Sequence, residues 1–254
     1  MSKKIKETDF LSISARVRVM ETRLLTAERM ERMIDARDAG EAAKVLGECG
    51  YPDLNEVTPA AVEEMLAQAQ GALFEDLGKA VSNPPLLDVF RCRYDYHNAK
   101  TLVKAAALGL DQKRLLLRGG RYDPEKLAED FHREDLRAYA PVFQEAVAHA
   151  RELLGSSGDP QQADFVLDRA YYQELAALAK ASGSKFLEGY VTLAIDGANL
   201  RSAVRCARLD KGPDFLRLVL VEGGSVSPAD IAVTPGPDLA RLYHSSPLLA
   251  AAEA

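Results

Sequence analysis

A ten-residue block occurs twice in this chain, and the duplication restricts the possible fold more than any other feature. The first copy, DYHNAKTLVK, runs from Asp95 to Lys104, and the second, DGANLRSAVR, runs from Asp196 to Arg205. Equivalent residues are 101 positions apart. Several matches in one order are typical of a repeated supersecondary unit, so we predict a duplicated helical unit.

A second pair of blocks follows the first after a slip of three residues. These are LLRGGRYDPEKL from Leu116 and LVEGGSVSPADI from Leu220. Both contain two adjacent glycines, which we expect to end helices. A phosphate-binding turn is the alternative, but neither glycine pair has the Walker pattern.

Each copy of the first block places an acid and an amide on one helix face. At about 100° per residue, Asp95 and Asn98 share an apolar face, and so do Asp196 and Asn199. An unsatisfied buried polar group costs about 1–3 kcal/mol. We therefore interpret both as structural polar pairs that tie a helix to a neighbouring helix end, with catalysis as the alternative. Replacing either amide by leucine is expected to lower thermal stability.

Basic residues lie on the opposite face of both copies. Like charges four residues apart on a helix repel by a few tenths of a kcal/mol, so a doublet present twice indicates acidic groups nearby. These acids belong to this chain or to a partner, and a solvated surface is the alternative. Reversing the charges of the first doublet is expected to weaken partner binding and leave melting nearly unchanged. The candidate partner-facing residues are Arg93, Lys100, Lys104, Arg201, Arg205 and Arg208.

The composition and the local signals both indicate helices. Ala, Leu, Glu, Arg and Lys dominate, Trp is absent, and no useful stretch alternates with period two. Thr58-Pro59 and Asp123-Pro124 each place a capping side chain before a proline at the first helical position. Residues 155–160 are expected to form a loop before a helix over 164–180. We predict an all-α fold.

Several functional classes are disfavoured by the same sequence. A net charge of −6 argues against a nucleic-acid surface. Cys49, Cys92 and Cys206 lack paired spacing, so we expect free thiols in a reducing compartment and no zinc site. The four histidines are scattered and no serine has a nucleophile motif, so we expect no catalytic residue, metal or cofactor. No secretory signal or membrane-spanning segment is expected.

The blocks together resemble the C subunit of prokaryotic V/A-type ATPases, a relative of the d subunit of the vacuolar enzyme. The resemblance rests on RVRVMETRLL from Arg16, FRCRYDYHNAK from Phe90 and DGANLR from Asp196, and it extends from Ile5 to Leu242. It implies three similar helical units arranged as a pseudo-threefold funnel. One side would sit on the proteolipid rotor ring and the other would receive the D and F axle subunits.

The resemblance also implies a non-catalytic central-stalk role, peripheral on the cytoplasmic face of the membrane. We expect a first unit over residues 1–121, a second over 122–225 and the start of a third over 226–254. A third copy of the repeated block would lie beyond Ala254, so the third unit is expected to be missing. A free-standing helical-repeat adaptor between proteins is the alternative function.

Overall fold

The computed structural model describes residues 7–111 and 115–253, and all of its regular elements in these ranges are helical. The all-α prediction is therefore confirmed. Contacts divide the chain into two compact units. Unit 1 comprises Met1–Leu87 with Leu117–Gly119, and unit 2 comprises Asp88–Leu116 with Gly120–Ala254. The repeat boundaries at residues 121 and 225 stay a prediction.

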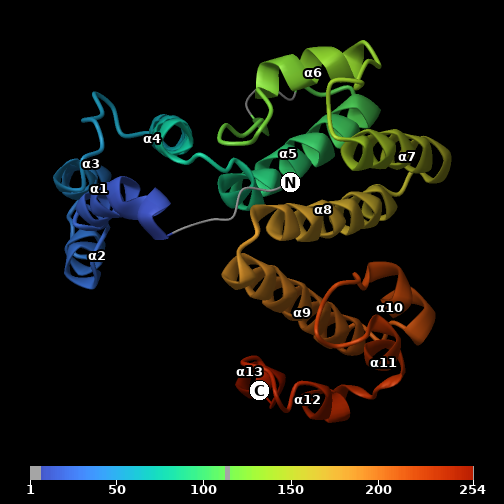
Figure 1. The fold of residues 1–254 in the computed structure, drawn as a ribbon. Coiled ribbons are helices and arrows are strands. Elements are labelled where there is room, and N and C mark those ends of the chain that lie inside the picture. Colours follow the sequence, from blue (N-terminus) through green and yellow to red (C-terminus); the bar gives the residue numbers. More distant parts are fainter. Residues whose placement is uncertain (1–6, 112–114, 254) are drawn as a thin grey trace. The chain divides into compact units, whose positions relative to one another are not determined.

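Side-chain caps open α2, α3 and α4 of unit 1, and Figure 1 labels these helices. The hydroxyl of Thr26 accepts a hydrogen bond from the Arg29 N–H, and Asp38 Oδ1 accepts one from the Glu41 N–H. Such caps satisfy N–H groups that have no partner within the helix. The elements are η1 Glu7–Phe10, α1 Leu11–Glu21, α2 Ala27–Ile34, α3 Ala39–Glu48 and α4 Pro59–Ala80.

Unit 2 contains most of α5 and the elements that follow it. Figure 1 shows α5, α7 and α8 side by side. The Tyr96 ring of α5 joins them, because it packs edge-on against Phe143 of α7 at 5.3 Å and Tyr171 of α8 at 5.7 Å. The elements are α5 Pro85–Leu108, α6 Pro124–His132, α7 Pro141–Ser157, α8 Pro160–Ser182, α9 Lys185–Arg208, α10 Pro213–Val219, α11 Pro228–Val233, η3 Gly236–Asp238, α12 Leu239–Leu242 and α13 Leu249–Glu253.

The predicted loop over 155–160 is wrong in extent. Helix α7 continues to Ser157, and α8 already begins at Pro160. Gly158 ends α7 in the left-handed region with φ 66°, and Asp159 then caps α8 through its Oδ1. The turn thus needs two residues, because a glycine stop and a cap followed by proline stand next to each other.

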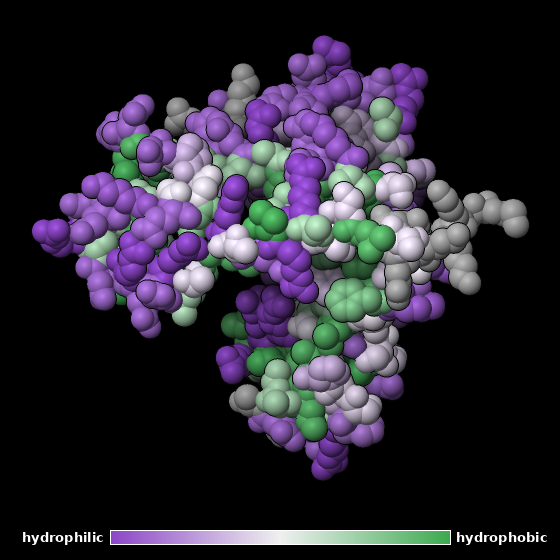
Figure 2. All heavy atoms as spheres, turned by 60° about the vertical axis from the view of Figure 1, so that its left-hand side comes forward, coloured by the Kyte–Doolittle hydropathy of each residue, from purple (hydrophilic) through white to green (hydrophobic). Residues whose placement is uncertain are grey.

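The C-terminal part of unit 2 has a core of its own on one side of α9. Ile231 of α11 and Tyr243 are fully buried there, beside Leu200 and Cys206 of α9. Apolar side chains also gather on the visible surface of the lower part of Figure 2, where α9 to α13 lie. Within the described ranges, no helix is both long and apolar enough to cross a membrane.

Candidate functional site: two buried polar pairs and a basic helix face

The second polar pair holds the chain segment that follows α10. Asn199 is fully buried; its Nδ2 donates to the Val221 carbonyl at 2.8 Å, and its Oδ1 accepts from the Val221 N–H at 2.9 Å. Asp196 Oδ1 accepts from the N–H groups of Ser225 and Val226 at 2.8 and 3.2 Å. Asp196 Oδ2 accepts from the Ser225 hydroxyl at 2.6 Å. Together these bonds fix a backbone turn against the middle of α9.

The acid of the first polar pair has the same relation to the equivalent turn. Asp95 and Asn98 are fully buried on α5. Asp95 Oδ1 accepts from the N–H groups of Arg121 and Tyr122 at 2.9 and 3.3 Å, and Oδ2 accepts from Arg121 Nε at 2.6 Å. In both copies the acid therefore binds the two N–H groups that follow a double glycine. That these pairs serve stability rather than chemistry stays a prediction.

The double glycines do not end helices, contrary to the sequence-based expectation. Helix α5 ends at Leu108 and α10 ends at Val219, well before the respective glycine pairs. The first glycine of each pair lies in the left-handed region, with φ of 98° at Gly119 and 103° at Gly223. Residues with a side chain rarely adopt this conformation.

The second glycine of each pair is required because the carboxylate of the buried acid lies directly against it. A Cβ atom on Gly120 would overlap Oδ1 of Asp95, and a Cβ atom on Gly224 would overlap Oδ1 of Asp196. Because the carboxylate must reach the N–H groups just beyond, backbone and acid cannot move apart without losing these hydrogen bonds. Glycine is the residue that fits.

A buried charge network extends the first pair toward α8. Arg121 Nη1 pairs with Glu174 Oε1 at 2.6 Å, and the Tyr96 hydroxyl donates to Glu174 Oε2 at 2.9 Å. Burial raises the pKa of Asp95 to about 6, although the nearby Arg121 guanidinium lowers it. The second copy has Ser225 in place of Arg121, so it lacks this ion network. The two copies share the hydrogen bonds between the acid and the turn.

The structure separates the six candidate basic residues into two groups. Lys100 Nζ pairs with Asp168 Oδ1 at 2.6 Å, and Lys104 Nζ pairs with Asp164 Oδ2 at 2.7 Å. The acids that the lysine spacing implies thus lie in this chain, on α8. Arg93 is exposed and lies over the neighbouring Tyr94 ring, 5.3 Å from its centroid.

The arginines of α9 differ from these lysines. Arg201, Arg205 and Arg208 are exposed, and none forms an ion pair within the part of the chain that the structure describes. That all six residues contact a partner stays a prediction. The prediction is stronger for the arginines of α9, because the lysines of α5 are already bound to acids of this chain.

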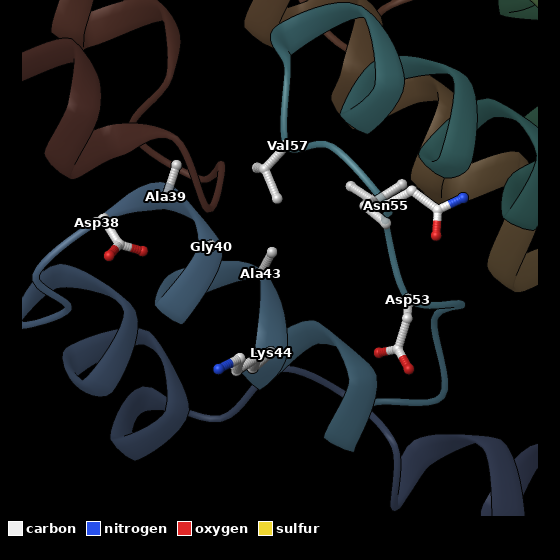
Figure 3. A pocket seen from close by; sticks show the side chains of 9 residues that line it. Asp38, Ala39, Gly40, Ala43, Lys44, Asp53, Asn55 and Val57 are labelled. Atoms are coloured by element: carbon white, nitrogen blue, oxygen red, sulfur yellow. The ribbon is translucent and has the colours of Figure 1, made fainter.

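A surface pocket lies in unit 1, between the first turns of α3 and residues 53–57 (Figure 3). Ala39, Gly40 and Ala43 form one side, and Asp53 and Asn55 lie across from them. Small side chains and isolated polar groups line it, without a paired nucleophile and base. Over residues 7–111 and 115–253, no cluster of three or more His, Cys, Asp or Glu residues could hold a metal.

The fold and the site define a class: an all-helical protein in which two long helices each hold a glycine turn through a buried acid. The sequence matches the ATP synthase (C/AC39) subunit family over residues 13–234, and the chain belongs to this family. The resemblance identified in the sequence is confirmed at this level.

Three relatives illustrate the similarity. The chain is 22% identical over 219 residues to the C subunit of the V-type sodium ATPase of Enterococcus hirae, covering 86% of this chain and 67% of the relative. It is 26% identical over 221 residues to the C subunit of the V-type ATP synthase of Thermus thermophilus, covering 81% and 66%. It is 25% identical over 240 residues to the C subunit of the A-type ATP synthase of Thermococcus kodakarensis, covering 87% and 63%. The matches thus span about two thirds of the length of these relatives.

Proposed function

We propose that this chain is a non-catalytic central-stalk subunit of a V/A-type ATPase or ATP synthase. In this role it couples the D and F axle subunits to the proteolipid rotor ring during ATP-linked ion transport. The observation that carries the proposal is the family match over residues 13–234, together with relatives named as C subunits of V-type and A-type enzymes. The complex would hold the chain at the cytoplasmic face of the membrane as a peripheral subunit.

The two polar pairs fit a mechanical role. A protein that transmits rotation must resist bending, and α5 and α9 are its longest helices, with 24 residues or about 36 Å each. Each is held near its middle by hydrogen bonds from a turn distant in sequence to a buried acid. Both carboxylate oxygens of Asp95 and of Asp196 have hydrogen-bond partners, and buried polar groups that are satisfied make a structure rigid. The polar pairs would therefore act as braces on the elements that carry the load.

Affinity capture tests the proposal. The tagged chain is recovered from native membranes in mild detergent, and the proteins that accompany it are identified by mass spectrometry. We expect the axle subunits, the proteolipid ring and the nucleotide-hydrolysing head. A tagged helical protein of similar size and charge serves as the control for non-specific recovery.

Recovery of none of these proteins by a chain shown to be folded would contradict the rotor role. Specific recovery of other proteins in their place would favour the helical-repeat adaptor. Because the matches span about two thirds of the relatives' length, the same capture also shows whether this portion is sufficient for assembly.

A further inference from the structure

Helices α5 and α8 show how two basic residues four positions apart are paired with acids inside this protein. Lys100 and Lys104 are one turn apart on α5, and Asp164 and Asp168 are one turn apart on α8. The later lysine pairs with the earlier aspartate, so the two helices run in opposite directions. Two lysines thus match an acidic pair with the same spacing on an antiparallel helix.

Helix α9 presents the same doublet without the acids. Arg201 and Arg205 occupy the positions equivalent to Lys100 and Lys104, and both are exposed. The Tyr172 hydroxyl of α8 interacts electrostatically with Arg201. Burial raises the pKa of Tyr172, so this hydroxyl is neutral near pH 7 and does not balance the arginine charge.

An acid near Tyr172 is already paired. Asp168 also acts on Tyr172, but it is bound to Lys100 at 2.6 Å. The charge of the α9 doublet is thus uncompensated within the described chain, although the whole protein carries a net charge of −6.

Apolar side chains continue the same face of α9 toward its N-terminus. Phe186 and Tyr190 lie on the side of the helix that carries Arg201, since steps of four and eleven residues return to nearly the same angle. Phe186 is 79% exposed and Tyr190 is 45% exposed, even though Tyr190 also touches the Phe90 ring. The exposed face is therefore apolar at one end and basic at the other.

A glycine, Gly197, lies between the two ends of this face. Gly197 stands where α5 has Tyr96, and the atom closest to a Cβ built on it is a methyl carbon of Leu248, at 3.9 Å. On α5 the tyrosine ring contacts α7 and α8. On α9 the corresponding place holds no ring, and Leu248 lies at van der Waals distance from it.

We propose that the α9 face formed by Phe186, Tyr190, Arg201 and Arg205 docks a helix of a separate partner protein. This helix carries two carboxylates four residues apart, followed by apolar residues, and it runs antiparallel to α9. Each carboxylate meets one arginine, as Asp164 and Asp168 meet the lysines of α5, and the apolar residues cover the two aromatic rings. The proposal goes beyond the rotor function and does not depend on it.

Peptide binding to the purified chain tests the proposal. The probe is a fluorescently labelled helical peptide with two aspartates four residues apart and leucines on the same face. The matched probe has the same composition, with the two aspartates on opposite faces. We expect the first to bind about tenfold more tightly in fluorescence anisotropy, since two charge pairs together contribute a factor of that order.

Charge reversal in the protein identifies the surface. Arg201→Glu with Arg205→Glu should weaken binding of the first probe about tenfold and should favour a version of the probe with lysines in place of the aspartates. Arg133→Glu with Arg137→Glu changes the net charge equally at another exposed place and should leave binding unchanged. Circular dichroism confirms that each variant is folded.

Three outcomes would overturn the proposal. Equal binding of the two probes would show general attraction of negative charge, and no binding would show that the face is only solvated. A dimer in sedimentation that disappears in the Arg201→Glu, Arg205→Glu variant would assign the face to a second copy of this chain. These experiments use no membrane complex, so their failure and failure of the rotor proposal are separate results.

Discussion

Oδ1 of Asp196 occupies the space that a Cβ atom on Gly224 would need. Asp95 and Gly120 have the same relation in the first copy. In both places the acid reaches past a glycine to bind two backbone N–H groups. The two repeated blocks therefore share the contact between the acid and the second glycine. That they derive from a duplicated helical unit stays a prediction.

The first prediction concerns these glycines. Gly224→Ala should lower the free energy of unfolding by about 1–3 kcal/mol, the usual effect of forcing atoms into a filled space, and Gly120→Ala should act in the same direction. The added methyl group must displace the carboxylate and break its hydrogen bonds to the turn. Thermal melting followed by circular dichroism measures the effect, at roughly 2–4 °C per kcal/mol for a chain of this size.

Two other glycines provide a matched control. Gly155 of α7 and Gly189 of α9 have open space around the position of a Cβ atom and negative φ. Alanine in a helix interior is favoured over glycine by about 0.5–1 kcal/mol, so these two substitutions should leave melting unchanged or raise it. If alanine lowered the melting temperature equally at all four glycines, the contact between acid and glycine would not explain the loss of stability.

The second prediction concerns the buried amide of Asn199. Asn199→Leu removes the partner of both the Val221 N–H and the Val221 carbonyl, and each group left unsatisfied costs about 1–3 kcal/mol. Chemical denaturation should show a clearly lower unfolding free energy. Asn55→Leu, on the exposed segment of unit 1, is the control and should have little effect. A stable Asn199→Leu variant would mean that the turn after α10 does not need this brace.

The third prediction is a pH dependence from Asp95. Its pKa in the folded protein is about 6, above the ordinary 3.8, so the folded form binds the proton more tightly than the unfolded form. Stability from this group is therefore fully present below the ordinary value and is lost as the pH rises through about 6. The difference in unfolding free energy, Asp95→Asn minus wild type, should increase from pH 4 to pH 6.5.

Denaturant titrations at several pH values measure this difference. Subtracting the wild type removes the pH dependence of all other groups that the substitution does not affect. Asp230→Asn, an exposed acid in the first turn of α11, gives the matched comparison. A difference that stays constant or decreases over this range would show that burial does not govern the ionisation of Asp95.

The sequence predicts where a helix begins when a capping side chain is followed directly by proline. Thr58 and Asp123 each cap a helix whose first residue is proline, as their sequence indicates. The loop predicted from residue 155 is wrong, because Gly155 and the serines after it have a loop-like composition but belong to α7. A glycine in a helix costs only about 1 kcal/mol, and packing of the nearby Leu154, which is 8% exposed, outweighs that preference.

The acids and amides of the site were found from the repeat, but their partners were not. Local helix periodicity places Asp196 on a buried face, yet it carries no information about a turn 29 residues later. The second pair of matching blocks was the available signal, since its double glycines recur with the acids. Likewise, the four-residue spacing of Asp164 and Asp168 matches that of the lysines on α5, and this correspondence could have indicated their pairing.

The last prediction revises an expectation from the sequence, namely that reversing Lys100 and Lys104 leaves melting nearly unchanged. Both lysines form ion pairs across α5 and α8. Their side chains are 27% and 37% exposed, so water screens each pair to about 0.2–1 kcal/mol. Lys100→Glu with Lys104→Glu replaces two attractions by two repulsions and should lower the unfolding free energy by about 1–2 kcal/mol.

A charge swap separates the ion pairs from other effects of these substitutions. Adding Asp164→Lys and Asp168→Lys to the reversed lysines restores opposite charges across α5 and α8, so the fourfold variant should regain most of the lost stability. Arg201→Glu with Arg205→Glu has no acid to lose within the described chain and should melt close to the wild type. If both reversed doublets melt alike, the difference between the two helix faces is not energetic, because the same charge change would then have the same effect with and without an acidic partner.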